Sequence, residues 1–210
     1  VGAGKTTLAR LIPRLIEPTQ GRVLLDAVPL DEWPLAQLRQ AIGYVAQTPF
    51  LFSDAMGVNI GYGVEEPTDE QIHQAAEEAQ VQADIEGFEN GFATVIGERG
   101  VTLSGGQKQR TTLARALLRR PEILILDDSL SAVDTHTEEA ILGHLRRIMA
   151  QRTTILIAHR ISTLRDADHI IVLDESGIAE RGTHAGLISF DGVYANLARR
   201  QQLADELEQM

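Results

Sequence analysis

Two neighbouring carboxylates follow an apolar run near the middle of the chain. Asp127 and Asp128 come directly after residues 123–126, which are all Ile or Leu. Such a run is expected for a strand that is buried on both faces of a parallel sheet. A carboxylate at the carboxyl end of that strand lies at the edge where α/β sheets bind their ligands. With a phosphate-binding loop nearby, Asp127 is a candidate Mg²⁺ ligand.

A glycine-rich segment at the start of the chain predicts that loop. Glycines let backbone N–H groups approach phosphate oxygens, and the start of the following helix favours anions. Lys5 would reach the β- and γ-phosphates of a nucleotide, and Thr6 would ligate Mg²⁺. The full pattern needs a further glycine five positions before Gly4, which falls before Val1, so we expect an N-terminally truncated piece of a longer protein. The candidate nucleotide-binding residues of this segment are Gly2, Ala3, Gly4, Lys5, Thr6 and Thr7.

A second glycine-rich turn opens another expected helix. Residues 103–107 read LSGGQ, and Ser104 is suited to cap the helix over 104–119. A serine and two glycines at a helix N-terminus form a nest of N–H donors for an anion. A chain that already carries one phosphate loop has no obvious need for a second nest on its own nucleotide. The candidate binding residues here are Ser104, Gly105, Gly106 and Gln107.

Strands that alternate with helices must position these residues. The pattern predicts an α/β fold with a mainly parallel sheet and an inserted helical lobe over residues 53–118. Thr68 is the expected N-cap of a helix within that lobe, with Gln71 three residues later. We expect strands at 21–26, 42–46, 122–127 and 153–158, the last also buried, a hairpin over 169–181, and helices at 8–16, 68–82, 104–119, 138–150 and 183–210.

The composition argues against several classes of protein and kinds of site. The chain has 210 residues, a net charge of −11 and no Cys. No run of Lys and Arg forms a basic stripe, which argues against a broad nucleic-acid surface. The absence of Cys excludes disulfides and thiolate metal sites. No apolar run approaches the roughly 18 residues of a membrane helix, and no signal peptide is visible.

Together the GAGKTT, LSGGQ and ILILDD motifs resemble the nucleotide-binding domain of an ATP-binding cassette (ABC) transporter. Residues 59–63 and 96–100 resemble the subclass of exporter half-transporters. The resemblance implies a P-loop NTPase (RecA-like) core over 1–52 and 119–185, a helical subdomain over 53–118 and a helical tail over 186–210. It also implies ATP and Mg²⁺ as cofactors, and an upstream membrane-spanning domain in the same polypeptide. The chain would then lie at the cytoplasmic face of the inner membrane and bind no nucleic acid.

The resemblance also assigns roles. Gln47 matches the Q-loop residue, which contacts Mg²⁺ or water and couples to the membrane domain. His159 matches the switch histidine at the γ-phosphate. Residues 131–134 match the D-loop, and residues 97–100 match the X-loop, which contacts the membrane domain. Two such domains dimerise head to tail, so that each LSGGQ turn contacts the γ-phosphate bound by the other domain. The family's adenine-stacking aromatic would precede Val1.

Asp128 departs from the family, which usually has glutamate as the general base at this position. Aspartate is one methylene shorter, so its carboxylate falls back by roughly 1.5 Å, one C–C bond. A misplacement of about 1 Å can cost on the order of 100-fold in rate. We therefore expect this site to bind ATP and hydrolyse it slowly. The chain would be the degenerate-site half of a heterodimer; the alternative is a homodimer that tolerates Asp128.

Two soluble classes are alternatives. An ABC ATPase of DNA repair or chromosome organisation would carry a long coiled-coil insertion, for which the spacing between Gln47 and Ser104 leaves no room. A ribosome-acting ABC protein would need a second cassette and usually basic linkers. We therefore expect the ATPase domain of a membrane exporter.

Overall fold

The computed structural model describes residues 2–97, 100–133 and 135–208. They divide into two compact units, and each is described by itself. The larger unit spans residues 9–157, and the smaller one combines the N-terminal residues through Leu8 with those from Ala158 onward. The domain boundaries expected from the sequence, at 53, 119 and 186, remain predictions.

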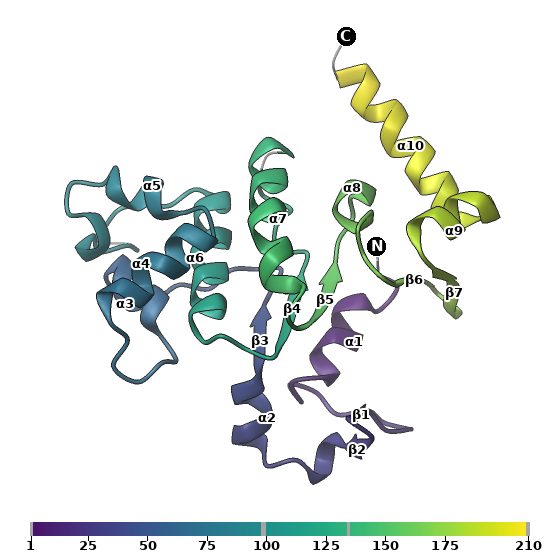
Figure 1. Cartoon of the computed structure of the whole chain (residues 1–210), viewed down its shortest axis with the longest axis horizontal. Helices are drawn as coiled ribbons and strands as arrows, with labels where there is room; N and C mark the ends of the chain where they lie inside the picture. The colour runs from purple at the N-terminus through teal and green to yellow at the C-terminus, as the bar shows by residue number, and fades with distance from the viewer. Residues whose placement is uncertain (1, 98–99, 134, 209–210) are drawn as a thin grey trace. The chain divides into compact units, whose positions relative to one another are not determined.

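A three-stranded parallel sheet forms the centre of the larger unit. Its strands are β3 (Ile42–Val45), β4 (Ile123–Asp127) and β5 (Thr153–Ile157), in the order β3-β4-β5 (Figure 1). Every residue of β4 is buried, which confirms the strand expected from the Ile/Leu run. The expectation that β5 is buried as well is wrong: Thr153 is exposed and the rest is half-buried. Among the described strands β5 pairs only with β4, so it is an edge strand of this sheet.

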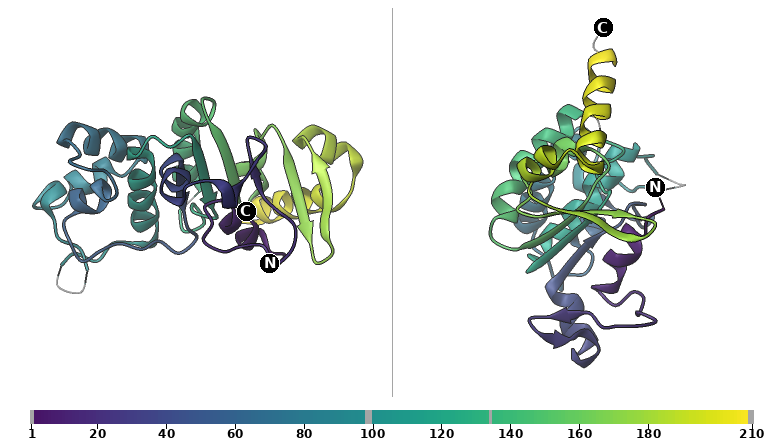
Figure 2. Two further views of the ribbon diagram at one scale, coloured as in Figure 1. Left: turned by 90° about the horizontal axis from the view of Figure 1, so that it is seen from below. Right: turned by 90° about the vertical axis from the view of Figure 1, so that its right-hand side faces the viewer.

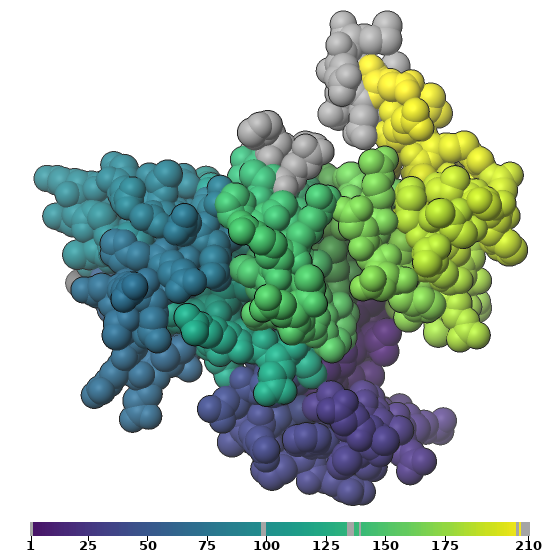
Figure 3. Space-filling view, in the orientation of Figure 1, coloured from purple at the N-terminus to yellow at the C-terminus, as the bar shows by residue number. Residues whose placement is uncertain are grey.

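The helical lobe expected over residues 53–118 is present in the larger unit. It comprises α3 (Met56–Gly61), α4 (Asp69–Glu78), α5 (Gln82–Glu86), η2 (Gly91–Ala93) and α6 (Gly105–Leu118). Thr68 caps α4 as expected, because its side chain accepts from the Gln71 N–H in a complete capping box. Helix α7 (Thr135–Met149) lies against this lobe in the space-filling view (Figure 3). Aliphatic side chains of the lobe, β4 and α7 share one core.

Two predicted helices are shorter than expected. The first, α1 (Lys5–Leu11), ends well before residue 16, because Pro13 has no N–H to donate to the carbonyl four residues earlier. The helix predicted over 68–82 divides into α4 and α5, because Gln80 between them takes a left-handed conformation with φ of 55°.

The segment between α1 and the sheet is a small hairpin followed by a helix. The strand expected over 21–26 is shorter, β1 (Leu24–Leu25), and pairs with β2 (Val28–Pro29). A short 3₁₀ turn, η1 (Leu30–Glu32), and helix α2 (Leu35–Ala41) then lead into β3. Leu30 and Leu38 from this segment pack with Ile42 and Ile125 of the sheet in a second core, so the segment covers part of the sheet.

The smaller unit contains the hairpin and helical tail that the sequence predicts. It comprises α8 (Ile161–Leu164), β6 (Ile170–Asp174), β7 (Gly177–Gly182), α9 (His184–Phe190) and α10 (Val193–Glu208). Strands β6 and β7 form a long antiparallel ribbon (Figure 2). Ile170, Leu187 and Tyr194 form its core. None of the described helices in either unit is both long and apolar enough to cross a bilayer.

Candidate functional site

The two carboxylates lie at the carboxyl end of β4, where the sequence places them. Asp127 is 1% exposed and Asp128 is 9% exposed. The Asp128 N–H donates to the Ile157 carbonyl at 2.9 Å. This bond extends the hydrogen bonding between β4 and β5 by one residue beyond the end of β4. Asp128 itself has φ of 49°, a left-handed conformation that aspartate adopts more readily than most residues. The chain turns away from the sheet at this residue.

Tyr44 of β3 holds Asp127. Its hydroxyl donates to Asp127 Oδ2 at 2.8 Å. Burial, and next the hydrogen bond to Asp127, raise the pKa of Tyr44, while a hydrogen bond with Arg10 acts in the opposite direction. Tyr44 was not among the site residues expected from the sequence. The only available signal was its place near the end of an expected strand.

Gln47 and Asp128, both expected in the catalytic centre, are brought together. The Gln47 side-chain amide donates from Nε2 to Asp128 Oδ2 at 3.0 Å. This leaves the amide oxygen of Gln47 as a potential ligand for a hard cation, which binds oxygen donors. The edge of the sheet thus gathers two carboxylates, a phenol and an amide from β3, β4 and the segments that follow these strands.

The turn after Asp128 is closed by its own hydrogen bonds. The Ser131 hydroxyl donates to the Asp128 carbonyl at 2.9 Å, and the Ser131 N–H donates to the same oxygen at 3.3 Å. The expected D-loop includes residues 131–133 of this turn, whereas Asp134 lies outside the described residues. The backbone of Asp128 is therefore held on both sides, through its N–H to β5 and through its carbonyl to Ser131.

The LSGGQ turn begins α6 with a capping box, as Ser104 predicts. The Gln107 N–H donates to Ser104 Oγ at 3.2 Å, and the Ser104 N–H donates to Gln107 Oε1 at 3.0 Å. Gln107 Nε2 also donates to Asp84 of α5 at 2.9 Å. Ser104 and Gly105 are exposed. The backbone of this turn is therefore presented outward, while the Gln107 side chain is used within the chain.

The smaller unit contains the remaining candidates. Gly2 and Gly4 have φ of 87° and 82°, conformations that glycine adopts without strain, and α1 begins at Lys5. His159 is exposed at the end of the segment that follows β5. The Gln201 side chain of α10 donates to the His159 carbonyl and accepts from the Ile161 N–H at 2.7 Å. Gln201, which was not expected from the sequence, therefore fixes the backbone between His159 and Ile161. The roles of Gly2, Gly4, Lys5, Thr6 and His159 remain predictions.

The expected X-loop is only partly described. Gly97 and Gly100 lie within the described residues, and Glu98 and Arg99 lie outside them. Residues Ile96 and Val101 on either side form a bridge. The contact of this loop with a membrane domain remains a prediction.

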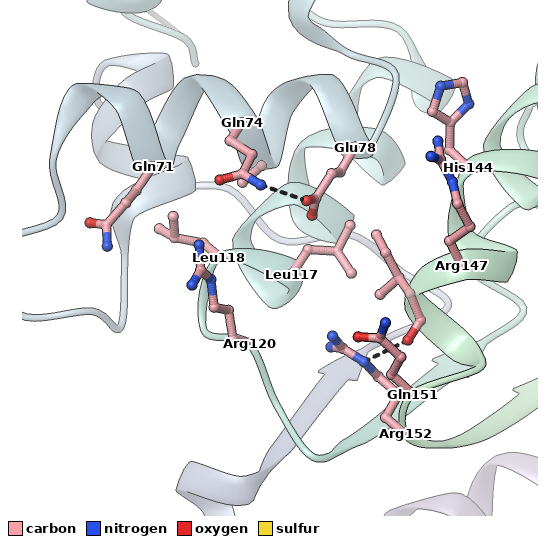
Figure 4. Close-up of a pocket in the computed structure, with 12 residues that line it drawn as sticks. Gln71, Gln74, Glu78, Leu117, Leu118, Arg120, His144, Arg147, Gln151 and Arg152 are labelled. Atoms are coloured by element: carbon pink, nitrogen blue, oxygen red, sulfur yellow. Dashed lines mark hydrogen bonds between the residues drawn. The ribbon is translucent and has the colours of Figure 1, made fainter.

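A separate hollow of about 490 Å³ lies between α4, the end of α6 and α7 (Figure 4). Arg120, Arg147 and Arg152 line it, together with Gln74, which donates to Glu78 at 3.2 Å. None of the residues expected to bind nucleotide or metal is part of its lining.

The described residues contain no cluster of three or more acidic or histidine side chains that could cage a metal ion.

Comparison with known proteins identifies the family. The model of the ABC transporter family matches residues 1–131, more than half of the chain. The chain therefore belongs to the ABC transporter family, which confirms the resemblance seen in its motifs.

Two of the curated relatives are a lipid flippase and a probable multidrug resistance transporter. The ATP-dependent lipid A-core flippase of Chromobacterium violaceum is 50% identical over 196 residues, covering 93% of this chain and 34% of the relative. The probable multidrug resistance ABC transporter ATP-binding/permease protein YheI of Bacillus subtilis is 46% identical over 202 residues, covering 96% of this chain and 34% of the relative. The chain thus spans about a third of the length of these relatives.

A solved structure agrees with the fold. A bacterial Atm1-family ABC exporter with ATP bound superposes with a TM-score of 0.92 at 44% identity, covering 96% of this chain and 35% of that chain. The predicted fold class, a P-loop NTPase with a mainly parallel sheet and inserted helices, is confirmed. None of these relatives favours the soluble alternatives.

Proposed function

We propose that this chain is the ATP-binding and ATP-hydrolysing domain of a membrane ABC exporter. Family membership supports ATP binding, and the names of its relatives support export of a small molecule, drug or lipid. The domain would work at the cytoplasmic face of the membrane, joined to a membrane-spanning domain in the same polypeptide. The observation that carries the proposal is the set of polar side chains at the end of β4, where Asp127 and Asp128 are each held by a residue of the β3 region.

The donor set fits Mg²⁺. Thr6 offers a hydroxyl, Asp127 a carboxylate and Gln47 an amide oxygen, all of them oxygen ligands as Mg²⁺ requires. Bound Mg²⁺ would neutralise charge on the β- and γ-phosphates. Tyr44 donates to Asp127 Oδ2, which helps to fix the orientation of the carboxylate.

The two glycine-rich segments divide the phosphate contacts between two domains. Gly2 to Thr7 would surround the phosphates of the nucleotide on this chain, with Lys5 at the β- and γ-phosphates. The Ser104 side chain and the backbone of Gly105 and Gly106 would meet the γ-phosphate bound by a second nucleotide-binding domain. The capping box supports this division, because Gln107 is held within the chain and leaves the turn's backbone facing out.

Asp128 and Gln47 would act on the attacking water, and His159 on the γ-phosphate. A positioned general base contributes roughly 100- to 10,000-fold in rate. The Asp128 backbone is held by Ile157 and Ser131, so it has little freedom to move forward and compensate for the shorter side chain. We infer slow hydrolysis at this chain's own site and pairing with a different subunit whose site this LSGGQ turn completes.

The experiment is ATP hydrolysis by the full-length transporter, purified together with its partner subunit. Lys5→Ala should lower Mg²⁺-dependent turnover or ATP affinity at least about 10-fold, because a charge-assisted contact to phosphate is lost. Arg22→Ala, which removes an exposed cation elsewhere in the chain, is the control and should leave both unchanged. Equal effects of the two variants, or turnover that does not depend on ATP and Mg²⁺, would contradict the proposal.

A further inference from the structure

A buried glutamine links the LSGGQ helix to the turn that carries Asp128. Gln109 lies on α6 and is 2% exposed. Its Oε1 accepts from the Ala132 N–H at 3.0 Å, and its Nε2 donates to Ser131 Oγ at 3.4 Å. Both amide atoms of one side chain therefore bind the expected D-loop of the same chain.

The link continues to Asp128. The Ser131 hydroxyl accepts from Gln109 and donates to the Asp128 carbonyl at 2.9 Å. Two hydrogen bonds thus connect α6 to the residue expected to act as the general base. Without the hydrogen bond from Gln109, the Ser131 hydroxyl loses one of its two partners. Its side chain can then rotate away from the Asp128 carbonyl, because a hydroxyl turns to suit the partners that remain.

The glycines of the LSGGQ turn pack on the same segment. A Cβ added at Gly106 would lie 3.3 Å from the Ala132 carbonyl oxygen, and one added at Gly105 would lie 3.3 Å from Ala132 Cβ. Both distances are tighter than ordinary contact, so the small size of these residues allows α6 to approach the turn closely. The LSGGQ turn therefore packs on Ala132, while Gln109 of the same helix supplies the hydrogen bonds to Ser131 and Ala132.

We propose that Gln109 is a positioning residue that couples the LSGGQ turn to the turn bearing Asp128 within one chain. This inference rests on the proposed function, since it assumes that both turns serve ATP hydrolysis. A displacement of the LSGGQ turn by the second domain's nucleotide would pass through Gln109 to Ser131 and to the backbone of Asp128. The two ATP sites of the dimer would then be connected through the interior of each subunit.

The test compares hydrolysis by full-length transporter variants, with kcat and KM for ATP measured separately. Gln109→Met keeps the length of the side chain and removes both hydrogen bonds. Ser131→Ala removes only the hydroxyl from an exposed position, so it tests the link even if Gln109→Met fails to fold. Each should lower kcat at this chain's own site, measured as single-site turnover, about 10-fold and leave KM within about twofold, because the link orients catalytic groups and does not contact phosphate.

Two controls separate coupling from general damage. Thr111→Val alters an equally buried residue of α6 whose hydroxyl donates to Gln107 O in the same helix, and it should leave kcat unchanged. Ser131→Thr keeps the hydroxyl, so its kcat should stay within about twofold of that of the parent.

The double variant decides the result. If Gln109 and Ser131 act through one link, Gln109→Met with Ser131→Ala should lower kcat no further than either single change. Additive losses, an equal loss in Thr111→Val, or unchanged kcat in the single variants would overturn the coupling. If the parent transporter hydrolyses ATP and these variants behave as it does, only the coupling fails. A parent without ATP hydrolysis would overturn the proposed function and the coupling with it.

Discussion

The end of β4 and the start of α6 both present polar groups suited to a nucleotide, and they are built in opposite ways. At the end of β4, Asp127 and Asp128 are buried and each has a side-chain partner from the β3 region. At the start of α6, Ser104 and Gly105 are exposed, and the side chain of Gln107 is tied to Asp84. The first region is organised around groups of its own chain, and the second presents backbone donors to something outside it. The difference favours two roles in ATP hydrolysis, one within this chain and one across a dimer.

The largest expected effect comes from neutralising the buried end of β4. Asp127→Asn should lower Mg²⁺-dependent hydrolysis at this chain's site at least about 100-fold, because a neutral amide is a poor ligand for a hard cation. Glu122→Gln makes an equivalent change, from carboxylate to amide, at the exposed residue just before the same strand and should have little effect. Single-site turnover of the full-length transporter measures both. Equal turnover in the two variants would contradict a role for the carboxyl end of β4 in Mg²⁺-dependent hydrolysis.

A smaller effect should separate stability from function at the start of α6. Ser104 and Thr68 cap two helices with the same kind of capping box. Replacing either by Ala should destabilise the protein by about 1 kcal/mol, measured by denaturant unfolding. Only Ser104→Ala should also reduce turnover, by about 10-fold, since only that turn is expected to meet a phosphate. A comparable loss of turnover in Thr68→Ala would show that the loss reports stability alone.

These two regions also show what the sequence could and could not predict. Strand β4, its two acids and the caps at Thr68 and Ser104 were predicted because their signals are local: an apolar run, or a polar residue followed three positions later by Gln. The partners of those groups were missed because tertiary register decides them. Tyr44 reaches Asp127 only because β3 and β4 are paired with Tyr44 opposite Ile125. Gln109 and Gln201 likewise bind backbone groups that are distant in sequence, and no spacing rule indicates them.

The smallest expected effect is the pH dependence of the stability that Tyr44 contributes beside Asp127. Because the pKa of Tyr44 is raised in the folded protein, the folded state retains the proton to higher pH than the unfolded chain does. The contribution of Tyr44 to the free energy of unfolding is therefore complete below the ordinary tyrosine pKa of 10.0 and decreases as the pH rises above it. The difference in thermal midpoint between the parent and Tyr44→Phe should shrink as the pH rises past this value. Contributions from the other tyrosines are common to both proteins and cancel. A difference that stays constant with pH would contradict the Tyr44–Asp127 account.

The most direct test of the account is Asp128→Glu in the full-length transporter purified with its partner. The added methylene should bring the carboxylate forward by roughly 1.5 Å and raise turnover by about 10- to 100-fold at this chain's site, while ATP affinity changes little. Asp128→Asn, which keeps the short side chain and removes the base, is the matched control and should give no gain. Full activity as a homodimer that Asp128→Glu leaves unchanged would contradict both the slow site and the division of roles between the two regions.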